Sequence, residues 1–195
     1  MSDGFLTLYV SAVRGAWITD WVTGSGARLT APGTDGLVAV LDLEGDRHLV
    51  DRDQLSALLA DDTDQTFQTW MSGSDDMIVT VRRHRYGDDG SRGFVGVTCY
   101  LDGLDPDDVD AVSRAAQEVI QTSSADALGL VVDRRGTTAD VDWDSFVASP
   151  GVVPAVPDLL ILASPQAASA ATHEGWWRPD TPVVGFSTWE NTAAG

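Results

Sequence analysis

Hydrophobic and polar residues follow their clearest pattern in the middle of the chain, over residues 77–136. Residues 77–81 and 94–101 have the apolar, β-branched composition of strands, and the polar segment between them predicts an antiparallel hairpin. Residues 106–122 place apolar side chains at helical spacing, and residues 128–133 form the continuous apolar run of a strand buried on both faces. The pattern therefore predicts a hairpin followed by a βαβ crossover.

The start of the helix in this unit is marked by its capping residues. Asp105 can accept hydrogen bonds from the free N–H groups of the first turn, and Pro106 suits the first helical position because it has no N–H. The two aspartates that follow suit the positive end of the helix dipole. The residues expected to face the sheet are Val109, Val112, Ala116, Val119 and Ile120.

The N-terminal part of the chain predicts several shorter elements. Glu44, Gly45 and Asp46 separate two apolar runs and form a turn signal, which indicates a second hairpin. Asp51 can cap a short helix, and Gln54, three residues later, can reach back to the Asp51 N–H. The strands expected here cover residues 5–13, 37–43, 48–50 and 66–71. In the first of them, Leu6, Leu8 and Val10 should face one side of the sheet, and Phe5, Thr7 and Tyr9 the other.

After residue 136 the pattern is less regular. Residues 140–147 predict a helical turn with Trp143 docked inward, and several prolines then interrupt the chain. Two more strands are expected, over residues 158–163 and 182–186. Residues 188–195 are expected to fray, as chain ends commonly do.

Together these elements predict an α+β fold with a mixed, mainly antiparallel sheet, in which a hairpin is followed by a βαβ crossover and helices pack on the sheet. We expect a single domain over residues 1–195, in which residues 150–195 could form a loose C-terminal extension. That segment is too short to fold alone without disulfides or a metal.

Charge is the unusual feature of the composition. The chain has 30 acidic and 12 basic residues, for a formal net charge of −18. All the basic residues are arginine, which is typical of a high-GC genome such as that of an actinobacterium. A surface this acidic repels nucleic acid and anionic membranes and attracts basic proteins. We therefore expect a protein partner, with no binding of nucleic acid or membrane.

The chain start and the single cysteine indicate a reducing compartment. The first ten residues have no basic region and no apolar run long enough for a signal peptide or a membrane span, so we expect a cytoplasmic protein. Cys99 has no partner for an internal disulfide and falls within a predicted strand, where a buried, inert thiol is expected.

Motifs for enzymatic chemistry are missing. His48, His84 and His173 are scattered, and one cysteine cannot complete a zinc site. No Gly-x-Ser-x-Gly motif occurs. The sequence therefore predicts a protein that is not an enzyme, with no catalytic residues, no cofactor and no metal.

Asp102 and Asp133 are one pair of carboxylates that could form an enzymatic site. If the strands that end before Asp102 and at Asp133 are parallel neighbours, both side chains emerge at the same edge of the sheet, where they could hold Mg²⁺ for phosphoryl chemistry. Asp102 and Gly103 are an ordinary turn pair, however, and no phosphate-binding lysine or glycine-rich loop accompanies the two aspartates. We therefore interpret both as structural.

Aromatic residues outside the regular segments are the candidate partner-binding residues. Trp17 and Trp21 are four residues apart, so a helical turn would place both rings on one side, beside Asp20. Trp176 and Trp177 lie in a second irregular segment. The alternative is that these rings cover the core and serve packing only.

Three arginines lie at the base of the central hairpin loop. They are Arg82, Arg83 and Arg85. We interpret them as neutralising nearby aspartates, and the alternative is a small site for an anion or a phosphate.

The middle third of the chain resembles a known class of proteins. The segments that carry the resemblance are residues 100–104, the capped helix, residues 129–136 and the pair Asp142 and Trp143. In these the chain resembles the small acidic immunity proteins that bacteria encode beside polymorphic toxins. The resemblance implies a protein that binds and blocks a toxin domain and has no catalytic residues.

Three functional classes stay open from the sequence. The first is an acidic inhibitor that binds a basic toxin domain directly. The second is a scaffold or assembly subunit of a phage-like or secretion particle, which would need an exposed apolar edge. The third is a small Mg²⁺-dependent hydrolase that uses Asp102 and Asp133.

Overall fold

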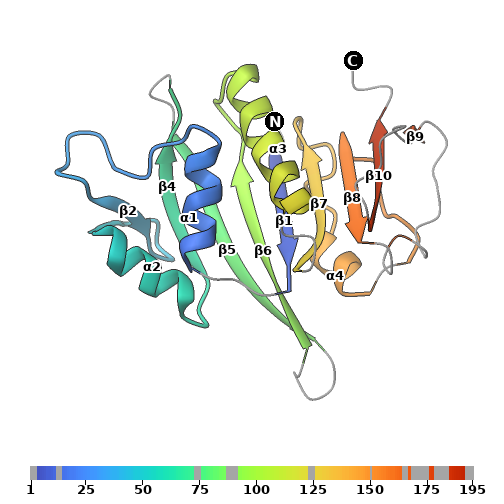
Figure 1. Cartoon of the computed structure of the whole chain (residues 1–195), viewed down its shortest axis with the longest axis horizontal. Helices are drawn as coiled ribbons and strands as arrows, with labels where there is room; N and C mark the ends of the chain where they lie inside the picture. The colour runs from blue at the N-terminus through green and yellow to red at the C-terminus, as the bar shows by residue number, and fades with distance from the viewer. Residues whose placement is uncertain are drawn as a thin grey trace.

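A computed structural model describes residues 4–11, 15–72, 76–86, 92–122, 126–149, 151–163, 167, 176–177 and 185–191. Within these residues the chain forms four helices and one sheet of ten strands (Figure 1). The strands are β1 Phe5–Val10, β2 Val38–Leu41, β3 Arg47–Val50, β4 Gln65–Trp70, β5 Asp76–Tyr86, β6 Arg92–Tyr100, β7 Ala127–Asp133, β8 Leu159–Ala163, β9 Trp176–Trp177 and β10 Phe186–Asn191. The helices are α1 Gly15–Gly24, α2 Arg52–Ala60, α3 Pro106–Thr122 and α4 Trp143–Ala148.

The strand order across the sheet is β3-β2-β4-β5-β6-β1-β7-β8-β10-β9, and its neighbouring strands pair antiparallel. The predicted α+β class, with helices packed on a mainly antiparallel sheet, is confirmed. None of the described helices is long and apolar enough to cross a membrane.

The central crossover differs from the prediction in one respect. β1 lies between β6 and β7, so that Phe5 pairs with Tyr100 on one side and with Asp133 on the other. β6 and β7 therefore run in the same direction, as the crossover helix requires, but they are not neighbours. The prediction of parallel neighbours was wrong because all six residues of β1 are buried, and such a strand is most stable at the centre of a sheet.

Two hydrophobic clusters cover the two faces of the sheet. On one face, Leu6, Leu8 and Val10 of β1 pack in the cluster that includes residues of α1, α2 and α3. Figure 1 shows these three helices together over that face. On the other face, Phe5 and Tyr9 pack with residues of α4, β8 and β10. The alternation predicted for β1 is confirmed.

The predicted helices follow their sequence signals. α2 begins with a complete capping box, in which Asp51 accepts from the Gln54 N–H and the Gln54 side chain accepts from the Asp51 N–H. The predicted inward face of α3 is confirmed, because Val112, Ala116 and Ile120 are buried and the other two predicted residues pack against the core.

The prediction that the chain frays from residue 188 is wrong for residues 188–191. Residues 182–184 lie outside the described residues, and the strand observed is β10, which the prediction left to fray from residue 188. β10 pairs with β8, with Trp189 opposite Leu160, and the Trp189 side chain is 3% exposed. The error arose because Glu190 and Asn191 look like a polar chain end, whereas the preceding tryptophan fills the second cluster.

Cys99 is buried in β6 as predicted, at 0% exposure, and burial raises the pKa of its thiol to about 12. At pH 8 we expect roughly one molecule in 10,000 to carry the reactive thiolate, so that an aromatic disulfide reagent reacts at least about 1,000-fold more slowly than with the unfolded chain. A colorimetric thiol assay with and without guanidinium chloride measures this. Rapid titration of one thiol in the folded protein would contradict the buried position.

Candidate functional site

A strongly acidic segment occupies one edge of the sheet. Residues 42–64, here called the acidic edge, contain eight acidic residues and two arginines, which is a net −6 of the chain's −18. All eight carboxylate side chains are exposed. They lie in and around β3, the outermost strand of the sheet, and α2, which follows β3 directly in the chain. One third of the chain's net negative charge therefore lies in this short segment.

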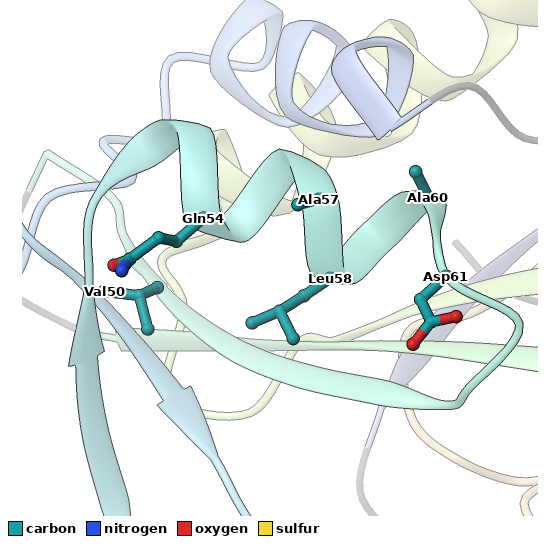
Figure 2. Close-up of a pocket in the computed structure, with 6 residues that line it drawn as sticks. All are labelled: Val50, Gln54, Ala57, Leu58, Ala60 and Asp61. Atoms are coloured by element: carbon teal, nitrogen blue, oxygen red, sulfur yellow. The ribbon is translucent and has the colours of Figure 1, made fainter.

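An apolar hollow, shallow and largely open to solvent, lies beside α2 within the acidic edge and has a volume of about 770 Å³. Figure 2 shows Val50 and Leu58 with their side chains turned into the same space, with Gln54 toward one end and Asp61 toward the other. A second hollow of about 370 Å³ also has Val50 and Leu58 in its lining and continues toward the β2–β3 hairpin. Asp61 lines the first hollow, and Asp42 and Asp64 line the second, so three carboxylates of the acidic edge adjoin this apolar surface.

The hollow exists because of where β3 ends and α2 begins. Asp51 caps α2 directly after Val50, and the chain turns from the strand into the helix at this point (Figure 2). Leu55 and Leu59 of α2 are fully buried, whereas Leu58 is only partly buried at the rim of the core. On the adjoining hairpin, Leu43 and Leu49 are exposed large apolar side chains. Leu43 lines the second hollow, whereas Leu49 alternates with Val50 along β3 and points to the other face of the strand.

Arginines of β5 hold the end of the acidic edge. The Arg83 guanidinium donates to the carbonyl oxygens of Leu59 and Thr63, and its backbone N–H donates to Asp64 Oδ1 at 2.8 Å. Arg85 forms an ion pair with Asp62. Arg85 thus neutralises an aspartate as predicted, whereas the Arg83 guanidinium binds backbone carbonyl oxygens.

The structure brings together three of the predicted partner-binding residues. Trp17 and Trp21 lie on α1 with ring centroids 6.2 Å apart. Asp20 is exposed and pairs with Arg52 of α2 at 3.4 Å, so this group adjoins the acidic edge. Trp17 is partly buried, whereas Trp21 is 5% exposed and belongs to the core. Trp21 therefore serves core packing, whereas Trp17 and Asp20 remain accessible to a partner.

The other two predicted partner-binding residues, Trp176 and Trp177, do not belong to the group formed by Trp17, Trp21 and Asp20. The backbone of Trp176 and Trp177 forms β9, which pairs with Glu190 and Asn191 of β10. Their side chains lie outside the described part of the chain. The sequence pattern did not reveal the hollow, because Val50 and Leu58 look like ordinary apolar positions at a strand end and in a short helix.

Asp102 and Asp133 lie at the ends of β6 and β7, at the same edge of the sheet, but their surroundings differ. Asp133 is fully buried, and its carboxylate accepts from the N–H groups of Arg135 and Thr138 and from the hydroxyls of Thr137 and Thr138. Asp102 is exposed and accepts from the Gly4 N–H at 3.1 Å. Among the described residues, no group of three or more His, Cys, Asp or Glu side chains is placed to hold a metal ion.

Comparisons with protein-family models, with curated proteins and with solved structures give no match to this chain.

Proposed function

We propose that this chain is a non-enzymatic cytoplasmic protein that binds and inhibits a basic protein partner, a toxin domain, through the acidic edge. The observation that carries the proposal is that eight exposed carboxylates and an apolar hollow lie within the same short segment, residues 42–64. Concentrated charge steers a partner of opposite charge, and the apolar centre supplies the desolvated contact that determines how long the complex lasts. Trp17 and Asp20 on neighbouring α1 extend this surface.

The proposal predicts that charge and apolar contact act on different rate constants. Replacing Glu44, Asp46 and Asp53 by Gln, Asn and Asn removes three charges whose side chains make no hydrogen bond or ion pair within the described part of the chain. At low salt this triple variant should slow association about tenfold and leave dissociation nearly unchanged. Replacing Leu58 by aspartate should instead speed dissociation.

The experiment starts with capture of the partner by the tagged chain from the source organism, followed by association kinetics over about 50–300 mM salt. A matched control removes three exposed charges elsewhere, at Asp107, Glu118 and Glu190, and should change association less than twofold. Capture of no basic protein would contradict the proposal. So would a salt-independent association rate, or equal effects of the two triple variants. Ordered self-assembly of the pure chain would favour the scaffold class.

A further inference from the structure

A second groove lies on the sheet face opposite α1, α2 and α3. It has a volume of about 520 Å³, within the range of small-molecule sites, and shares no lining residue with the two hollows of the acidic edge. Its floor comes from β1, β5 and β6, and its rim from residues 139–144, which lead into α4. Helix α4 covers the neighbouring β7–β8 part of this face, which leaves the groove beside it.

Three carboxylates form the rim. They belong to Asp140, Asp142 and Asp144. Asp144 Oδ1 accepts from the Tyr9 hydroxyl at 2.9 Å, and Asp144 Oδ2 lies 3.4 Å from His84 Nε2. Burial raises the pKa of Tyr9 well above its ordinary value, so the phenol keeps its proton and stays a donor. The Asp144 carboxylate is therefore held in one orientation.

The other two rim carboxylates differ in how firmly they are held. Asp142 accepts from the Ser145 hydroxyl at 2.7 Å and from the Ser145 N–H at 2.9 Å, and these bonds lower the pKa of Asp142. Asp142 thus stays ionised at neutral pH. The exposed Asp140 side chain makes no hydrogen bond or ion pair with any residue that the structure describes. The rim therefore carries two carboxylates held by hydrogen bonds, Asp142 and Asp144, and one, Asp140, without a described partner.

Arg82 faces the same groove from β5. Its neighbours Arg83 and Arg85 make ion pairs or hydrogen bonds, but Arg82 makes neither with any described residue. Three carboxylates share the groove with it, and none is close enough to pair with it. The groove therefore contains one positive side chain, that of Arg82, and three carboxylates that do not form an ion pair with it.

The floor between these charges combines hydroxyls and aromatic rings. The Thr7 and Thr98 hydroxyls hydrogen-bond to each other at 2.9 Å, and the lining also includes Phe5, Tyr100 and Trp143. Of these rings, Phe5 and Trp143 are buried, and the partly exposed Tyr100 can pack against an aliphatic stem or a guanidinium plane. A ligand could span the groove with its two ends on opposite charges.

We propose that this groove binds a small zwitterion of net positive charge, in the chemical class of the basic amino acids. Its carboxylate would pair with Arg82, and its cationic groups with Asp140 and Asp144. A plain anion would meet three carboxylates, and a plain cation would leave Arg82 without a partner and repelled. This inference does not depend on the proposed inhibitor function, because it uses a different surface.

The test is isothermal titration calorimetry of the full chain with L-arginine and L-lysine. We expect saturable binding of at least one of them, with a dissociation constant below about 1 mM. Agmatine lacks the carboxylate of arginine and norvaline lacks the guanidinium, so each should bind at least about tenfold more weakly than L-arginine if L-arginine is the ligand.

Variants then assign the two ends of the ligand. Arg82→Gln should weaken L-arginine at least about tenfold but leave agmatine unchanged or tighter, and Asp140→Asn should weaken both. Arg52→Gln, on the distant helix α2, is the control and should change neither. Thermal melts check that each variant is folded.

The proposal is overturned if neither amino acid gives saturable binding at about 10 mM. Agmatine binding as tightly as L-arginine would also overturn it, since Arg82 would then have no role. Binding that Arg82→Gln and Asp140→Asn leave unchanged in folded protein would place the ligand elsewhere and equally overturn it.

Discussion

Replacing Asp133 by alanine should destabilise the protein by about 3–5 kcal/mol, because a fully buried carboxylate with several charge-assisted hydrogen bonds is lost. Thr138 donates to Asp133 Oδ2 from its N–H at 2.5 Å and from its hydroxyl at 2.7 Å. The same hydroxyl accepts from Trp143 Nε1 at 3.2 Å. Removal of the carboxylate would therefore leave buried donors unpaired and loosen the attachment of α4.

Asp102 provides the matched control at the same edge of the sheet. It is exposed, and Asp102→Ala should cost at most about 1 kcal/mol, as for a partly hydrated hydrogen bond. Urea unfolding of both variants measures the difference, provided that the dependence on urea concentration stays the same. Equal costs for the two variants would contradict the structural role of Asp133. A melting temperature raised saturably by Mg²⁺, and lost in Asp133→Asn, would favour a metal site instead.

Replacing Trp189 by alanine should cost about 3–5 kcal/mol, because the ring fills the cluster on the second face of the sheet. It packs there with residues of β1, β7 and β8 and with α4. Loss of so large a side chain leaves a cavity that the rigid sheet on one side cannot close. The C-terminal strand is in this sense part of the core.

Glu190, the next residue of the same strand, gives the comparison. Its side chain is exposed, so Glu190→Ala should change stability by less than about 0.5 kcal/mol. Denaturant unfolding of both variants measures the difference. If Trp189→Ala proved as mild as Glu190→Ala, the C-terminal segment would be the frayed end that its polar residues first indicated.

Local signals in the sequence were sufficient for most individual elements. Asp51 and Gln54 predicted the start of α2, and Asp105 and Pro106 predicted that of α3, because capping depends on residues a few positions apart. The alternation in β1 and the apolar run of β7 placed their side chains on the observed faces. Burial of Cys99 also followed from its position in a strand.

The order of the strands depended on contacts between distant segments. Nothing near β6 or β7 indicates that β1 lies between them, since the strand that fills that gap comes from the start of the chain. Trp21 and Trp189 could not be assigned from sequence for a related reason. A tryptophan in an irregular or terminal segment can be buried or exposed, and only the surface it meets determines which.

Both candidate sites also arise from the tertiary structure. Val50 and Leu58 look like ordinary core residues in the sequence, and they line a hollow only because β3 is the outer strand beside α2. Arg82 and Asp140 are far apart in the chain and reach one groove through the packing of residues 139–144 against the sheet. The sequence alone established the net charge and the local elements. The distribution of that charge around two concave surfaces came from packing, because it depends on which distant segments meet.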